Sequence, residues 1–91
     1  MTSILVIEDE KNLLQLIKQG LMKSGYQVEI AANGKEGIRK FDGGNFDLVI
    51  TDFEMPDING GIVARHIHDT AKQYTPVISA SFFPNHSQWK N

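Results

Sequence analysis

The sequence contains no cysteine, no excess of basic residues and no apolar run of membrane-spanning length. Without cysteine, the chain has no disulfide framework, no zinc–thiolate site and no thiol nucleophile. Lysine and arginine number 9 against 11 acidic residues, and because both signs are scattered, no basic stripe indicates nucleic-acid binding. The apolar stretch at residues 4–7 meets acidic residues at once and is too short for a signal peptide. We therefore expect a cytoplasmic protein that binds neither nucleic acid directly nor a membrane.

Strand and helix patterns alternate along the 91 residues, of which 41% are hydrophobic. That size and composition predict one domain with a small core. The expected strands are residues 3–7, 26–31, 47–51 and 75–81, and the expected helices are residues 10–23, a short helix from Asn33 to the Gly43-Gly44 pair, and residues 61–70. The βαβαβαβ order predicts a parallel sheet with right-handed crossovers and helices on both faces.

Local signals mark several helix ends. Gly25 follows the first helical pattern at the position of a left-handed C-cap. Asn33 is a good N-cap, and Glu36 three positions later completes a capping box. His66 and His68 are two residues apart on a predicted helix, so they cannot share a face as a metal pair, and we expect both on the surface.

Acidic residues follow two of the apolar strands directly. Glu8 and Asp9 end the first strand, and Asp52 ends the third. In an open α/β sheet, ligands bind in the crevice beyond the carboxyl ends of the strands, so these three side chains are expected to meet there. Crowded like charges repel, and a hard divalent cation is the expected guest. The alternative is three solvated loop carboxylates.

Three segments, spread over residues 3–81, carry a more specific signal. They are Ile-Leu-Val-Ile-Glu8-Asp9-Glu10, then Asp-Leu-Val-Ile-Thr-Asp52-Phe-Glu-Met55-Pro56-Asp57-Ile-Asn-Gly60, and finally Pro76-Val77-Ile78 ahead of Ser79 and Ser81. In order and spacing they resemble the receiver domain of two-component response regulators. The resemblance implies a flavodoxin-like doubly wound parallel sheet with strand order 2-1-3-4. It assigns residues 1–81 to the receiver domain and leaves residues 82–91 as an atypical aromatic tail.

The resemblance also implies roles for the acidic residues. Asp52 is the phosphoacceptor, which takes a phosphoryl group from a histidine kinase or a phosphotransfer protein. Asp9, Asp52 and the backbone carbonyl of Glu54 bind Mg²⁺ directly, and Glu8 reaches it through water. Phosphoryl transfer depends chiefly on positioning and charge neutralisation, which these residues can supply. The implied module signals through protein contacts and is not an enzyme.

Two serines compete for the hydroxyl that completes the switch in this family. Counting from Pro76, the family register selects Ser81. The Ser79-Ala80 pair, however, resembles the hydroxyl-plus-alanine pair usual at that position. A shift of two residues keeps a side chain on the same face of a strand, so both serines remain candidates. We favour Ser81 because it lies nearer the carboxyl end, and either serine can instead be an ordinary strand-end residue.

The resemblance fails after the fourth strand, where the family continues with a fourth helix, a fifth strand and a fifth helix. Only ten residues follow Ser81 here, and Lys90 is not assigned the role of the family's site lysine. The fourth strand is therefore expected to have an exposed edge, which is a template for pairing with another chain. We hypothesise a homodimer in which the tail aromatics cover this gap; they are Phe82, Phe83 and Trp89.

Two other functions remain open. A phosphorylation-independent scaffold protein could use the same fold and a homomeric surface, which the short length and the aromatic tail favour. A phosphohydrolase that uses Asp52 and Glu54 as an acid pair is remote, because it needs a second acid and a lysine downstream.

Overall fold

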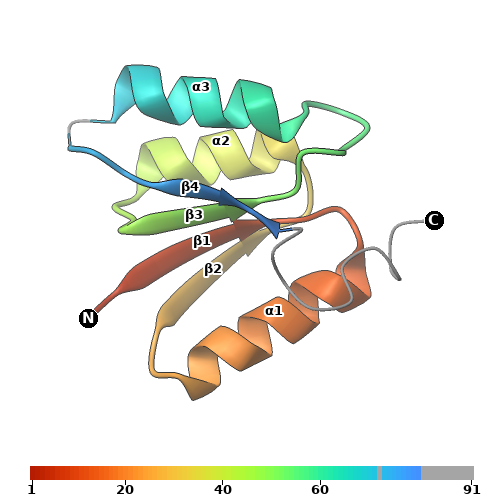
Figure 1. Ribbon diagram of the computed structural model, residues 1–91, viewed down its shortest axis with the longest axis vertical. Helices are drawn as coiled ribbons and strands as arrows, with labels where there is room; N and C mark the ends of the chain where they lie inside the picture. Colours follow the sequence, from red (N-terminus) through yellow and green to blue (C-terminus); the bar gives the residue numbers. More distant parts are fainter. Residues whose placement is uncertain (72, 81–91) are drawn as a thin grey trace.

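A four-stranded parallel sheet organises the computed structural model, which describes residues 1–71 and 73–80. Its elements are β1 (Ser3–Ile7), α1 (Lys11–Lys23), β2 (Gln27–Ala31), α2 (Gly34–Gly43), β3 (Leu48–Thr51), α3 (Gly60–Thr70) and β4 (Val77–Ser79). The strand order is β2-β1-β3-β4. Helices α2 and α3 cover one face of the sheet and α1 covers the other (Figure 1). The expected flavodoxin-like arrangement is confirmed. No helix in the described ranges is long and apolar enough to cross a membrane.

Strand β1 lies inside the sheet and supplies side chains to both cores. Ile4 and Val6 pack in the cluster beneath α1, whereas Leu5 and Ile7 pack in the cluster beneath α2 and α3. All four side chains are at most 2% exposed. A strand covered on both faces is apolar at every position, which explains why this segment of the sequence does not alternate.

The predicted helix ends are confirmed at two places. Gly25 has a φ of +93°, and its N–H donates to the Met22 carbonyl at 3.0 Å while that of Tyr26 donates to Leu21 at 3.2 Å. This pair of bonds is a Schellman motif, in which glycine avoids the strain of the left-handed region. At the start of α2, the side chain of Asn33 accepts the Glu36 N–H at 2.8 Å.

Several boundaries differ from the sequence prediction by one residue, and the differences at the start of α1 and in β4 have identifiable causes. Glu10, expected as the first helical residue, instead caps α1, because its carboxylate accepts the Leu13 N–H at 2.8 Å. The fourth strand, expected over residues 75–81, is confined to Val77–Ser79 in the structure. Among the described strands β4 pairs only with β3, so its length is set by the three residue pairs that it forms with that strand.

His66 lies at the surface, as expected, but it also makes a contact that the sequence does not indicate. Its Nε2 lies 2.7 Å from Oδ1 of Asp42, and its side chain is 28% exposed. The contact links α3 to α2 on the outer face of the domain. His68 is exposed, as expected.

Candidate acidic site at the carboxyl edge of the sheet

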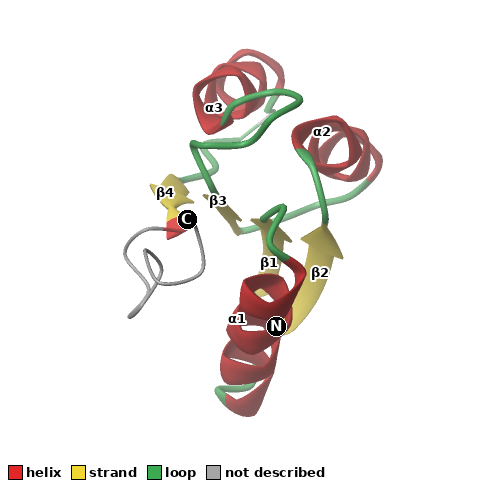
Figure 2. Cartoon of the chain, turned by 90° about the vertical axis from the view of Figure 1, so that its right-hand side faces the viewer, coloured by secondary structure: helices red, strands yellow, loops and turns green. Residues whose placement is uncertain are grey.

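The three acidic residues predicted to meet do lie together, at the edge toward which the strands run. Figure 2 looks onto this edge. The pairing of β1 with β3 aligns Ile7 with Thr51, the last residue of each strand. Glu8 and Asp52, which follow directly, therefore lie side by side. One carboxylate oxygen each from Glu8, Asp9 and Asp52 lie within 4.8 Å of one another. The sheet register therefore builds the cluster from two segments far apart in the sequence.

Backbone hydrogen bonds fix both strand ends at this point. The N–H of Asp52 donates to the Ile7 carbonyl at 2.9 Å, and that of Glu8 donates to Ala31 at 3.0 Å. Glu8 is fully buried and Asp52 is 2% exposed, whereas Asp9 is half-buried. Burial of carboxylates lowers the stability of the fold unless hydrogen bonds or cations stabilise them. The cluster therefore indicates a functional site rather than a purely structural feature of this edge.

Main-chain N–H groups orient two of the carboxylates. Oε2 of Glu8 accepts the Glu10 N–H at 2.8 Å. Oδ1 of Asp52 accepts the Glu54 N–H at 2.9 Å, which folds the chain back just after β3. Glu54 itself is exposed in the loop of residues 52–59. The first residues of this loop are thus held close to Asp52.

The rest of the loop is anchored to the core and to two helices. Met55 is 7% exposed and belongs to the cluster beneath α2 and α3. The side chain of Asn59 accepts the Ile62 N–H at 3.1 Å and caps α3. Gly60 leaves no room for a side chain, because a Cβ atom there would lie 2.6 Å from the Asp52 carbonyl oxygen. The start of α3 therefore packs directly against the strand end that carries Asp52.

Asp57 is a functional candidate that sequence reasoning missed. Its two carboxylate oxygens accept the N–H groups of Gly34 at 3.1 Å and Lys35 at 3.0 Å, at the start of α2. Desolvation raises the pKa of Asp57, but hydrogen bonds from the backbone N–H groups of Lys35, Ile58 and Gly34 together outweigh it and hold the pKa below its usual value. The sequence presents Asp57 only as one residue of the receiver-like segment and gives it no role, because its partners lie in a distant segment.

Of the two candidate switch serines, the structure describes only Ser79. Ser79 is the last residue of β4, pairs in register with Thr51 and is half-buried. Ser81 lies outside the described residues, as do Lys90 and the tail aromatics.

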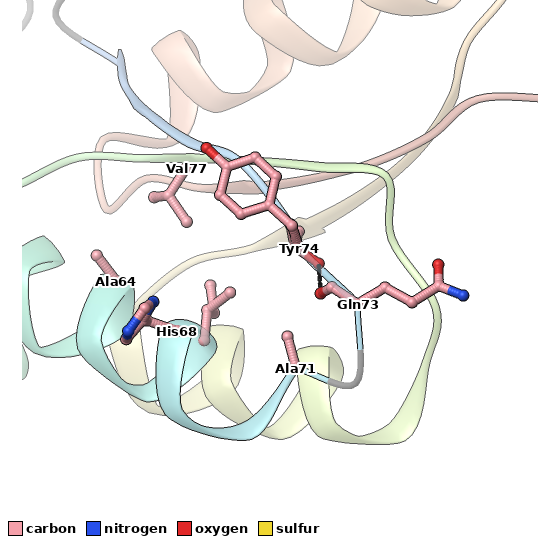
Figure 3. Close-up of a pocket in the computed structure, with 8 residues that line it drawn as sticks. Ala64, His68, Ala71, Gln73, Tyr74 and Val77 are labelled. Atoms are coloured by element: carbon pink, nitrogen blue, oxygen red, sulfur yellow. Dashed lines mark hydrogen bonds between the residues drawn. The ribbon is translucent and has the colours of Figure 1, made fainter.

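A separate groove lies between α3 and β4. It has a volume of about 400 Å³ and is lined by eight residues, among them Ala64, His68, Ala71, Tyr74 and Val77 (Figure 3). Tyr74 is 88% exposed. The described lining residues include none of the three carboxylates, so this groove is not the acidic site.

The donor set of the acidic cluster suits a hard divalent cation. It offers only carboxylate oxygens, two of them from buried side chains. Mg²⁺ prefers oxygen ligands and is usually held by one or two carboxylates with several waters. A soft metal that needs thiolate finds no cysteine in this chain. The residues present therefore fit magnesium.

Comparison with known sequences identifies relatives over most of the chain. Response regulator ArlR of Staphylococcus haemolyticus is 38% identical over 78 residues, which cover 86% of this chain and 35% of the relative. ArlR of one Staphylococcus epidermidis strain is 41% identical over the same length. The chain thus spans about a third of the length of the curated relatives it matches.

Solved structures agree with these relatives. The response regulator protein TrrA of Thermotoga maritima, in complex with Mg²⁺-BeF, is 40% identical with a TM-score of 0.82, over 98% of this chain and 80% of that one. A complex of histidine kinase ThkA with TrrA gives 33% identity and a TM-score of 0.76, over 97% of this chain and 93% of that one. The profile of the response regulator receiver domain matches residues 4–90. Sequence, fold and the position of the acidic cluster agree, and this chain belongs to the family of response regulator receiver domains.

Proposed function

We propose that this chain is a phosphoacceptor module of a two-component phosphorelay, with Asp52 as the residue that receives the phosphoryl group. The observation that carries the proposal is the convergence of three carboxylates within 4.8 Å, one of them directly after β3. The complex of histidine kinase ThkA with TrrA supports a histidine kinase as the donor, and a phosphotransfer protein is the alternative donor. Transfer would take place in the cytoplasm.

The transfer itself is a displacement at phosphorus. A carboxylate oxygen of Asp52 forms a bond to phosphorus while the bond from phosphorus to the donor's histidine nitrogen breaks, and that nitrogen keeps the electron pair. The product is an acyl phosphate on Asp52. The Glu54 N–H, 2.9 Å from Oδ1 of Asp52, orients the carboxylate for this attack. Such positioning supplies much of the catalysis of phosphoryl transfer.

Mg²⁺ would be held by Asp9, Asp52 and the backbone carbonyl of Glu54, with Glu8 acting through a water molecule. When bound, the ion neutralises the negative charge that gathers on the carboxylates and the phosphoryl oxygens. The structure of TrrA in complex with Mg²⁺-BeF supports magnesium as the ion, by similarity. A hydroxyl would then report the phosphoryl group to the rest of the domain. Ser81 is our choice by register, with Ser79 as the alternative.

Intact-mass measurement after incubation with acetyl phosphate and Mg²⁺ tests the proposal. We expect one added phosphoryl group on the wild-type chain, none on Asp52→Asn and none when a chelator removes the metal. Asp47→Asn is the matched control, because Asp47 is an exposed aspartate at the opposite end of β3, and it should be labelled like the wild type. Labelling of Asp52→Asn would refute the assignment.

A folded wild-type chain that takes up no phosphoryl group would instead favour the scaffold function. The feature that favours it is β4, a three-residue strand at the edge of the described sheet, with all three residues half-buried. Such an edge can pair with another chain without any chemistry at Asp52.

We propose in addition a homodimer that forms through the β4 edge and the aromatic tail of residues 82–91, which follows a receiver unit of residues 1–81. The exposed ring of Tyr74 beside the groove between α3 and β4 supports an interface on this side. Size-exclusion chromatography with light scattering should give twice the chain mass at micromolar concentration. Tyr74→Ser and Val77→Lys, which alter the groove and the edge, should shift the mass toward one chain. A monomeric wild type would contradict the dimer.

A further inference from the structure

The first N–H groups of α2 have partners from two different segments. Within the first turn of a helix these groups have no intrahelical acceptor, so side chains or water must satisfy them. Here Asn33, the local N-cap, takes the Glu36 N–H. The N–H groups of Gly34 and Lys35 donate instead to Asp57, which lies in the loop between β3 and α3. The helix is therefore joined to that loop through one carboxylate.

Close packing accompanies these hydrogen bonds. A Cβ atom at Gly34 would lie 2.6 Å from the Ile58 carbonyl oxygen and 2.9 Å from the Ile58 Cβ. The absence of a side chain at Gly34 thus lets the backbone of α2 approach the loop directly beside Asp57. Hydrogen bonds and contact act at the same point, which leaves the loop little freedom to move away from the helix.

The joined loop carries one of the three carboxylates of the acidic site. It begins at Asp52, and its early part is folded back by the bond from the Glu54 N–H to the Asp52 carboxylate. Between that bond and Asp57, Met55 is buried in the core. Displacement of Asp57 would therefore be passed to Glu54 through a short segment that is anchored at both ends.

We propose that Asp57 is a positioning residue of the acidic site: by joining the loop to α2, it holds Glu54 and the Asp52 carboxylate in the arrangement that binds Mg²⁺. The inference rests on the proposed function. Asp57 acts through Glu54 and Asp52 rather than by contact with the metal. Direct hydrogen-bond partners of metal ligands commonly change metal affinity by about 10- to 100-fold when they are replaced, and for Asp57, which acts one step further away, we expect the lower end of that range.

The test measures two properties of Asp57→Ala under conditions where each variant is shown to be folded. The first is the Mg²⁺ dissociation constant from an NMR titration, which we expect to rise about 10-fold. The second is the solvent exchange rate of the Glu54 amide without metal, which should rise as its bond to Asp52 opens more often. Asp57→Asn keeps one accepting oxygen and should fall between the wild type and Asp57→Ala in both measurements.

Asn33→Ala is the matched control, because it removes a cap from the same helix without releasing the loop. It should lower the urea concentration at which the chain unfolds and leave both site measurements near the wild-type values. If Asn33→Ala changes them as much as Asp57→Ala does, or if Asp57→Ala changes neither, Asp57 only stabilises α2 and the proposal fails.

The two proposals can fail separately. A wild-type chain without saturable Mg²⁺ binding would count against the proposed function. If the Glu54 amide then exchanged faster in Asp57→Ala but not in Asn33→Ala, Asp57 would still be shown to hold the loop. An unchanged exchange rate in Asp57→Ala would overturn that role as well.

Discussion

Magnesium is expected to raise the free energy of unfolding of this chain by about 2.7 kcal/mol at roughly 100 times its dissociation constant. The reason is geometric, since only the folded sheet brings Glu8, Asp9 and Asp52 within 4.8 Å of one another. A cation held among them would relieve their mutual repulsion and would have no equivalent site in the unfolded chain. Urea unfolding at increasing MgCl₂, with KCl added to equalise ionic strength, measures the effect.

Asp9→Asn should change stability in two ways, one without magnesium and one with it. Without metal, removal of one of three crowded charges should stabilise the fold, because less repulsion remains. With magnesium present, most of the stabilisation that the ion gives the wild type should disappear, because the proposed direct ligand Asp9 is lost. Asp47→Asn, which alters an exposed aspartate at the other end of β3, should keep the full magnesium response. A full response in Asp9→Asn would exclude Asp9 as a ligand.

Gly60→Ala is expected to lower stability by about 2 to 3 kcal/mol, the upper part of the range for overpacked sites. Its Cβ atom would lie 2.6 Å from the carbonyl oxygen of Asp52, 2.7 Å from the ring of Phe53 and 2.9 Å from the Phe53 Cα. Two of these atoms are backbone and cannot rotate aside, so α3 and the end of β3 must separate. Urea unfolding measures the loss, and weaker Mg²⁺ binding should accompany it.

Gly61→Ala is the neighbouring control for this substitution. A Cβ atom there would meet only the side-chain oxygen of Asn59, at 3.1 Å, and alanine favours a helix over glycine. Its stability should therefore lie within about 1 kcal/mol of the wild type. Equal stabilities of Gly60→Ala and Gly61→Ala would show that the start of α3 can move away from Asp52 at no cost.

The sequence was sufficient to predict the sheet and the meeting of the carboxylates. Both follow from periodic patterns: apolar strands at regular intervals specify a parallel order, and parallel order places Glu8 and Asp52 at the same edge. Helix caps at Asn33 and Gly25 were equally predictable, because each is decided by residues a few positions apart.

The features that were missed depend on contacts between distant segments. Asp57 reads as an ordinary turn residue, and nothing near it in the chain indicates that its carboxylate joins α2. His66 is similar, since its partner Asp42 lies on another helix. Glu10 was misplaced for a different reason: glutamate is a common helical residue, and only the geometry shows its side chain turned back to accept the Leu13 N–H. The helix or turn propensity of a residue does not indicate which distant group its side chain will contact, or whether it will cap a helix rather than begin it.

The direction of the three crossover helices has an electrostatic consequence. Each helix follows a strand and begins near the carboxyl edge of the sheet (Figures 1 and 2). The backbone dipole of a helix places about half a positive charge at its amino end. The connectivity that gathers acidic side chains at this edge therefore also directs positive backbone ends toward it. An anionic group that approaches this edge would meet a field in which the main chain offsets part of the side-chain charge, a benefit that an antiparallel sheet of the same residues would not provide.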